Sequence, residues 1–119
     1  MLFPRFRSRE RDLRADIERL STIQVAIDRA IADAASERTG LANRVEDARS
    51  RAAFLYGDVI DGEVEGDRKS AAMIVDAEQL LVRGELRREE LEAHFEILQD
   101  LKRRIDAAIQ ALAEENVED

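Results

Sequence analysis

The chain has no cysteine and no tryptophan, only one proline and five glycines, and aromatic residues make up 4% of its 119 residues. Without cysteine there are no disulfides and no thiol chemistry, so the cysteine content does not indicate whether the protein resides in an oxidising or a reducing compartment. No apolar run approaches the roughly 20 residues of a membrane-spanning helix. The N-terminus also lacks the apolar core of about 7–15 residues that a secretory signal needs. These absences predict a cytoplasmic protein of one domain.

Charge of both signs is abundant instead, since charged residues make up 39% of the chain and the formal net charge is −8. A net negative chain argues against broad, charge-driven binding of nucleic acid, which needs a basic face. Alanine, glutamate, arginine and leucine dominate, and that composition is typical of long helices and coiled coils. We therefore expect an all-α protein for which nucleic acid is not a favoured partner.

Two long segments, 9–56 and 67–115, carry apolar residues at alternating spacings of four and three. This heptad pattern is sustained over about six repeats in the first segment and predicts helices that pack along a coiled-coil seam. The predicted fold is a long antiparallel helical hairpin that dimerises into a four-helix bundle. The first stripe is Leu13, Ile17, Leu20, Gln24, Ile27, Ile31, Ala34, Arg38, Leu41, Val45, Ala48, Ala52 and Leu55. The second is Ser70, Met73, Ala77, Leu80, Gly84, Arg87, Leu91, His94, Leu98, Leu101, Ile105, Ala108 and Leu112.

When the second segment folds back on the first, the predicted register pairs residues whose numbers add up to about 125. Val45 then lies opposite Leu80, and Ile27 lies opposite Leu98. Registers seven residues apart would satisfy the same heptads, so the pattern supports a hairpin more strongly than it supports this register.

The stretch 57–66 is the predicted tip between the two helices. Asp61 and Gly62 have the composition of a type I′ turn. An isolated two-stranded hairpin is marginal in water, so we expect an irregular loop here, with the small β-hairpin as the alternative. The alternating acidic residues resemble the start of a calcium loop, but the twelfth position is Ala72, where that loop needs a bidentate glutamate. The tip is therefore interpreted as a solvated acidic turn.

Charged residues and glycines interrupt both stripes at one level and define a polar waist of Arg38, Gly40, Gly84 and Arg87. Each glycine costs about 1 kcal/mol in a helix relative to alanine. We expect continuous helices whose waist arginines reach water or the nearby acidic residues Glu37, Glu85 and Glu90. The alternative is a pair of kinks at the two glycines, which would give four shorter helices.

A further set of residues recurs every seven positions on the second segment, one step after part of the main stripe. In a lone hairpin this set would face water, and exposed apolar patches of this kind mark contact sites. The sequence therefore predicts a homodimer. The predicted interface contains Ile74, Leu81, Phe95 and Ile109, together with Ile23 of the first segment.

Residues that could carry catalysis are sparse. His94 is the only histidine, and its place on the predicted stripe favours a packing role. A di-metal bundle needs a glutamate three residues before a histidine, and that position is Leu91. Phosphate-loop, dinucleotide, zinc-protease and CxxC patterns are absent. We expect no enzymatic activity, no cofactor and no metal.

Residues 1–8 are predicted to form a flexible basic and aromatic arm, because Pro4 disfavours an earlier helix start, and residues 116–119 form an acidic tail. The arm either covers the end of the bundle or binds a partner protein or an anionic membrane surface. The residues that would make that contact are Leu2, Phe3, Arg5, Phe6 and Arg7.

Together these patterns predict a non-enzymatic, homo-oligomeric coiled-coil adaptor, scaffold or regulatory protein-binding module. One alternative is a small chaperone or clamp for another polypeptide. The other is a membrane-surface or nucleic-acid binder that acts through the arginines of the arm.

Overall fold

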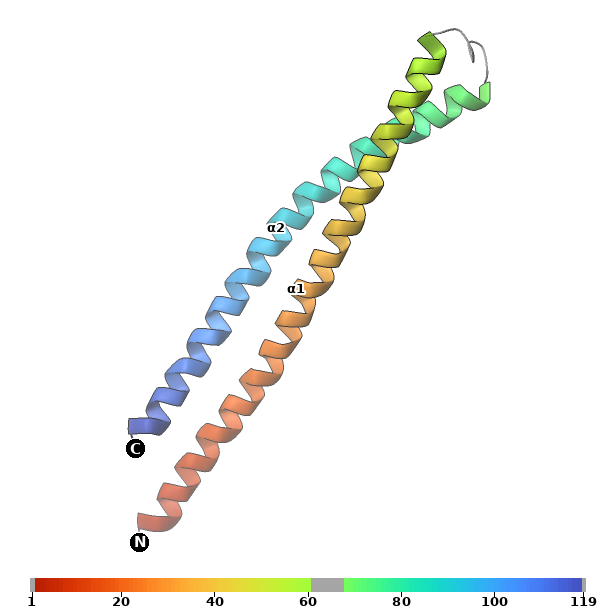
Figure 1. The fold of residues 1–119 in the computed structure, drawn as a ribbon. Helices are drawn as coiled ribbons and strands as arrows, with labels where there is room; N and C mark the ends of the chain where they lie inside the picture. The colour runs from red at the N-terminus through yellow and green to blue at the C-terminus, as the bar shows by residue number, and fades with distance from the viewer. Residues whose placement is uncertain (1, 61–67, 119) are drawn as a thin grey trace. The chain divides into compact units, whose positions relative to one another are not determined.

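The computed structural model describes residues 2–60 and 68–118, and it describes side chains within 8–57 and 68–115. The described chain forms two α-helices, α1 (Leu2–Ile60) and α2 (Arg68–Glu118) (Figure 1). The two helices pair as an antiparallel hairpin, which confirms the predicted all-α fold. The turn predicted around Asp61 and Gly62, and the choice between a β-hairpin and an irregular loop, lie outside the described residues.

Both ends of α1 extend beyond the predicted segment 9–56. The predicted start after Ser8 relied on Pro4, yet α1 begins at Leu2 and places Pro4 in its first turn. A proline there loses no hydrogen bond, because the first N–H groups of a helix have no partner within the helix. At the other end, α1 continues through Gly57, which was predicted to follow it.

The waist glycines do not interrupt the helices. α1 runs continuously through Gly40, and α2 runs continuously through Gly84. The alternative of four shorter helices is therefore not observed.

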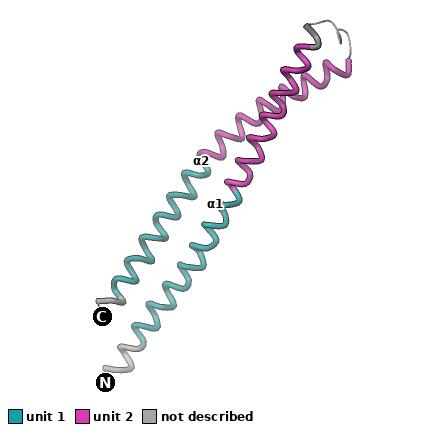
Figure 2. Tube along the Cα trace, in the orientation of Figure 1, with its two compact units in different colours: residues 1–33, 94–119 teal, residues 34–93 magenta. Residues whose placement is uncertain are grey.

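The chain divides into two compact units, and each contains one stretch of each helix (Figure 2). Unit 1 is Met1–Asp33 with His94–Asp119, and unit 2 is Ala34–Ala93. The buried apolar side chains of unit 1 are Leu13, Phe95 and Leu98. Those of unit 2 are Ala34, Leu41, Val45, Ala48, Ala52, Leu55, Ala77 and Leu91. Every buried residue of α1 belongs to the stripe predicted for it.

On α2 the predicted stripe is wrong at four positions. Met73, Arg87, His94 and Leu101, which were predicted to face the seam, are exposed. Phe95, which was predicted to face a second copy, is buried with 7% of its surface exposed. Most of the described residues of α2 that are buried or half-buried follow a four-then-three spacing, with one lapse at the exposed Arg88: Ser70, Ile74, Ala77, Leu81, Gly84, Leu91, Phe95, Leu98, Lys102, Ile105, Ile109 and Leu112. Leu80, Asp106, Ala108 and Ala113 are half-buried beside this stripe.

The register also differs from the predicted one by about one helical turn. In unit 2, Val45 lies against Gly84 rather than opposite Leu80. The centre of this unit is a cluster of Leu41, Val45 and Leu91, with Leu81 packed against it. This shift in register follows from which face of α2 packs on α1. When α2 turns the stripe of Ile74, Leu81 and Phe95 toward the seam, Gly84 takes the place opposite Val45 that Leu80 was predicted to take.

Candidate functional site

The predicted waist is a set of ion pairs in unit 2. Arg87 holds Glu37 with two parallel hydrogen bonds, in which Nε donates to Oε2 at 2.7 Å and Nη2 donates to Oε1 at 3.0 Å. Its Nη1 also donates to Glu90 Oε1 at 3.4 Å. The hydrogen bond to Glu37 and then that to Glu90 raise the pKa of Arg87 above its ordinary value. Arg38, the second waist arginine, pairs with Glu92 at 3.5 Å.

Because these guanidinium groups are already satisfied by carboxylates of the same unit, the waist holds α1 against α2. Two parallel N–H···O bonds fix the relative position of the groups they join, so the Glu37–Arg87 pair contributes to register as well as to energy. The waist therefore offers no open cation for an anionic ligand.

A second polar network joins the helices in unit 1. Gln24 Nε2 donates to Asp106 Oδ1 at 2.8 Å. Lys102 Nζ donates to Asp28 Oδ1 at 2.8 Å and lies 3.7 Å from Asp106 Oδ2. The hydrogen bond to Asp28 raises the pKa of Lys102 above its ordinary value of 10.5, and desolvation opposes that rise. Lys102 thus occupies a seam position with its ammonium group bonded at the rim, as a long basic side chain can.

The predicted chemical candidates are not brought together. His94 is exposed, and its pairing with a second catalytic group is not seen among the residues whose side chains are described. Within the described parts of both helices, no group of three or more histidine or acidic residues is arranged to hold a metal ion. A stretch apolar and long enough to cross a membrane is likewise not found in the described helices.

Of the residues predicted to form a dimer interface, most lie within the hairpin itself. Phe95 is buried in unit 1, and Leu81 packs on the core cluster of unit 2. Ile74 and Ile109 are half-buried, and Ile23 alone of the five is exposed. These residues were expected to be free because α2 was assigned the wrong inner stripe.

A different apolar stripe faces away from the seam in unit 2. Val75, Val82 and Leu86 are exposed, and the last two have 63% and 59% of their surface in contact with solvent. Val75 and Val82 precede the seam residues Ala77 and Gly84 by two positions, which places them about 200° away around the helix. We call Val75, Val82 and Leu86 the outward stripe.

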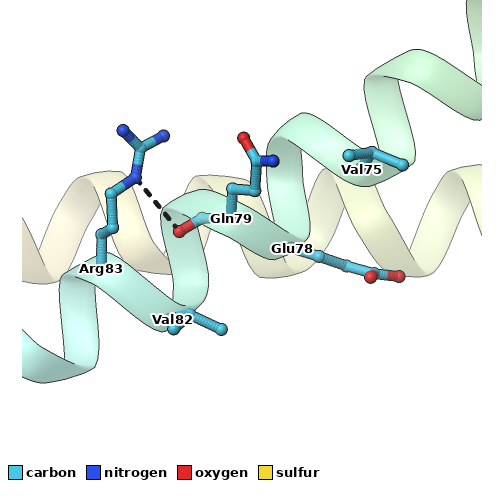
Figure 3. Close-up of a pocket in the computed structure, with 5 residues that line it drawn as sticks. All are labelled: Val75, Glu78, Gln79, Val82 and Arg83. Atoms are coloured by element: carbon cyan, nitrogen blue, oxygen red, sulfur yellow. Dashed lines mark hydrogen bonds between the residues drawn. The ribbon is translucent and has the colours of Figure 1, made fainter.

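A shallow hollow of about 490 Å3 lies beside the outward stripe (Figure 3). The described residues that line it all come from α2, and Figure 3 draws them: Val75, Glu78, Gln79, Val82 and Arg83. Arg83 Nε donates to the carbonyl oxygen of Gln79 at 3.4 Å, one turn earlier on the same helix. The two valines give the hollow an apolar surface with polar residues at its edge.

A narrower hollow of about 270 Å3 lies between α1 and α2 in unit 2. We call it the flank groove, and its described lining residues are Arg51, Leu55, Met73, Asp76, Ala77, Leu80 and Arg83. Leu55 and Ala77 are buried at its floor, whereas both arginines are exposed. The groove therefore combines an apolar floor with cationic walls contributed by two different helices.

The predicted arm lies where the structure describes the backbone only. Its residues from Leu2 onward belong to α1, and their side chains lie outside the described set. The side chains of the predicted acidic tail, 116–119, also lie outside it.

Sequence reasoning did not anticipate the hydrogen bonds that Gln24, Asp28 and Asp106 make between the helices of unit 1. It also did not anticipate the outward stripe or the flank groove. The spacing of Lys102 and Asp106, four residues apart, is a signal for an ion pair on one helix face. The spacing of Val75, Val82 and Leu86 could also have been found, since it repeats the heptad pattern on a second face. No protein-family model, curated protein or solved structure matches the chain.

Proposed function

We propose that this protein is a non-enzymatic coiled-coil module that self-associates and binds another protein, acting as an adaptor or scaffold. The observation that carries the proposal is the outward stripe, an apolar helix face that points away from the seam in unit 2. A helix that needed only one partner would be polar on this side. Apolar stripes at heptad spacing are the surface on which a further helix packs.

The proposed self-association is a homodimer in which the outward stripes of two copies pack together. This replaces the interface expected from Ile74, Leu81, Phe95 and Ile109, because Phe95 is buried and the other three are half-buried in the hairpin. Ion pairs between α1 and α2 within each unit hold the two helices together, and they occupy the charged groups that they join. That property suits a scaffold more than it suits a catalyst, which needs convergent groups.

The self-association is tested by analytical ultracentrifugation of the full chain and of Val82→Lys. Val25→Lys is the matched control, because Val25 is similarly exposed but lies on α1 in unit 1. The expected result is a dimer that dissociates in Val82→Lys and persists in Val25→Lys. A wild-type chain that stays monomeric up to about 100 µM, a concentration at which weak interfaces form, would exclude the homodimer.

The partner-binding part of the proposal is tested by affinity purification of the full chain followed by measurement of stoichiometry. A protein recovered in a fixed ratio to the chain supports the adaptor function. A chain that is monomeric and recovers no partner in a fixed ratio would contradict the proposed function as a whole.

A small chaperone or clamp is the second candidate, and the exposed large apolar residues of unit 2 favour it. Phe54 is 71% exposed, and Tyr56 and Met73 are exposed as well. Such residues can bind transiently unfolded segments of other chains. Suppressed aggregation of a heat-denatured client enzyme, lost in Phe54→Ser, would support this candidate over the adaptor.

A further inference from the structure

We infer that the flank groove of unit 2 is a docking site for an acidic amphipathic helix of a partner protein. This inference rests on the proposed binding function and names the chemistry of the partner. It concerns a surface separate from the outward stripe, although Arg83 borders both hollows.

The floor of the groove determines the kind of anchor it takes. Leu55 and Ala77 are buried beneath it, and Met73 and Leu80 line it from α2. Methionine adapts to differently shaped partners because its side chain is unbranched and flexible. The volume of about 270 Å3 is below the roughly 300–1,000 Å3 of small-molecule pockets. It therefore suits one or two apolar side chains presented by a polypeptide.

The walls of the groove determine the charge of the occupant. Arg51 stands on α1 and Arg83 on α2, and neither makes an ion pair with a residue that the structure describes. Other arginines of unit 2 do make such pairs with glutamates: Arg38, Arg49, Arg87 and Arg88. The groove therefore places two guanidinium groups, which make no ion pair with a described residue, beside an apolar floor, where they can bind an external carboxylate.

Asp76 also lines the groove, so the described part of its lining contains two guanidinium groups and one carboxylate. A partner carboxylate beside either arginine would complement this excess of positive charge, whereas a lysine there would be repelled by both arginines. Carboxylate–arginine hydrogen bonds are among the strongest that exposed side chains make.

A helix is the form of partner that satisfies floor and walls together. Laid along a groove between two helices, an amphipathic helix places apolar residues at i, i+3, i+4 and i+7 on the floor. Its flanking positions then carry acidic residues toward α1 on one side and α2 on the other. This is the geometry by which a third helix joins a pair.

The test is a fluorescence-anisotropy titration of the full chain with two designed peptides of about 18 residues, long enough for a helix of several turns. Both peptides carry leucine at the four anchor positions. One is flanked by glutamate and the other by lysine. The protein variants are the wild type, the double variant Arg51→Glu with Arg83→Glu, and Arg49→Glu as the matched control outside the groove.

We expect the glutamate-flanked peptide to bind with a Kd of about 10–100 µM, as weak, transient contacts of small area do. Binding should weaken at least about tenfold in the double variant, because both attractive charge pairs become repulsive and a tenfold change in Kd corresponds to only about 1.4 kcal/mol. Arg49→Glu should leave it unchanged. Circular dichroism and thermal unfolding of each variant show whether it remains folded.

Three outcomes would overturn the inference. They are equal or tighter binding of the lysine-flanked peptide, no binding of the acidic peptide up to about 1 mM, and unchanged binding in the double variant. Loss of self-association in a folded double variant would assign the groove to a second copy and would also overturn it. If the wild type still dimerises through Val82 while the peptide fails to bind, the groove alone is wrong and the proposed function stands.

Discussion

Gly84 lies so close to Val45 that a Cβ at position 84 would be 2.5 Å from Val45 Cγ2. The same Cβ would lie 3.8 Å from Leu41 Cδ1. Val45 and Leu41 are both buried, and a β-branched valine has little freedom to turn away. Glycine at this point of α2 therefore permits the close approach of the two helices, and it does so where helix propensity alone would favour alanine.

Replacing Gly84 by alanine should destabilise the protein despite the better helix propensity of alanine. The clash with Val45 forces a shift in a packed core, which typically costs about 1–3 kcal/mol. Gly40→Ala is the matched control, because a Cβ there meets only the flexible Arg44 Nη1 at 3.7 Å. We expect Gly40→Ala to gain about 1 kcal/mol. Chemical denaturation of both variants measures the difference, and a stabilised Gly84→Ala would show that the helices are not in close contact here.

The two leucines Leu91 and Leu86 should respond very differently to truncation. Leu91 is 1% exposed in the core cluster of unit 2, whereas Leu86 belongs to the outward stripe. We expect Leu91→Ala to lower the free energy of unfolding by about 2–5 kcal/mol. Leu86→Ala should change it by less than about 0.5 kcal/mol in the monomer, as surface substitutions do. Urea denaturation at low protein concentration distinguishes them, and equal losses would mean that the inner face of α2 is misassigned.

The hairpin could be predicted from sequence because heptads persist through both long segments and only one loop-like stretch separates them. The inner stripe of α1, though not the two ends of the helix, was predicted for the same reason. Its outer face is mostly polar near each seam residue, so Leu13, Leu41 and Val45 admit one inner stripe only.

The inner face of α2 could not be predicted, because apolar residues stand at two adjacent positions of several heptads. Met73 precedes Ile74, Leu80 precedes Leu81, and Ala108 precedes Ile109. Either set completes a stripe with Ala77, Gly84 and Leu91. The structure turns the second set toward the seam, because Ile74 is half-buried and Phe95 is buried whereas Met73 and His94 are exposed. Burying Phe95 rather than His94 removes more apolar area from water.

The polar contacts were partly predictable. Arg87 was expected to reach acidic neighbours, and it bonds Glu37 and Glu90. The acidic residue that pairs with Arg38 depends on the register, and the observed shift of about one turn makes Glu92 that residue. The flank groove depends on the same shift, because Arg51 and Leu80 belong to helices whose alignment heptads alone leave open.

Charge reversal across the waist should be recovered by a compensating reversal. Arg87→Glu removes two hydrogen bonds to Glu37 and adds repulsion, so its Tm should fall. Adding Glu37→Arg restores an opposite pair and should recover most of that loss, while repulsion from Glu90 keeps the recovery incomplete. The loss in the single variant should shrink at 1 M salt, where the Debye length is about 3 Å. Thermal unfolding in a double-mutant cycle checks this, and additive effects would mean that the pair does not interact in solution.

The stability of unit 1 should depend on pH through Lys102 in the alkaline range only. Its hydrogen bond to Asp28 raises the pKa of the ammonium group above the ordinary value of 10.5. A base whose pKa is higher in the folded state stabilises that state fully below the unfolded pKa, and the contribution is lost as pH rises through the folded pKa. Between pH 7 and 9 the contribution should therefore be constant, and above 10.5 it should decline.

Lys102→Met isolates this contribution, because lysine and tyrosine groups elsewhere titrate equally in both proteins. We expect the free energy of unfolding to fall less steeply in Lys102→Met than in the wild type as the pH rises above 10.5. Arg103→Met is the control, since Arg103 bonds Asp100 on its own helix and an arginine does not titrate in this range. Urea denaturation at a series of pH values gives both slopes. Parallel curves for wild type and Lys102→Met would show that the bond between Lys102 and Asp28 is not formed in the folded protein.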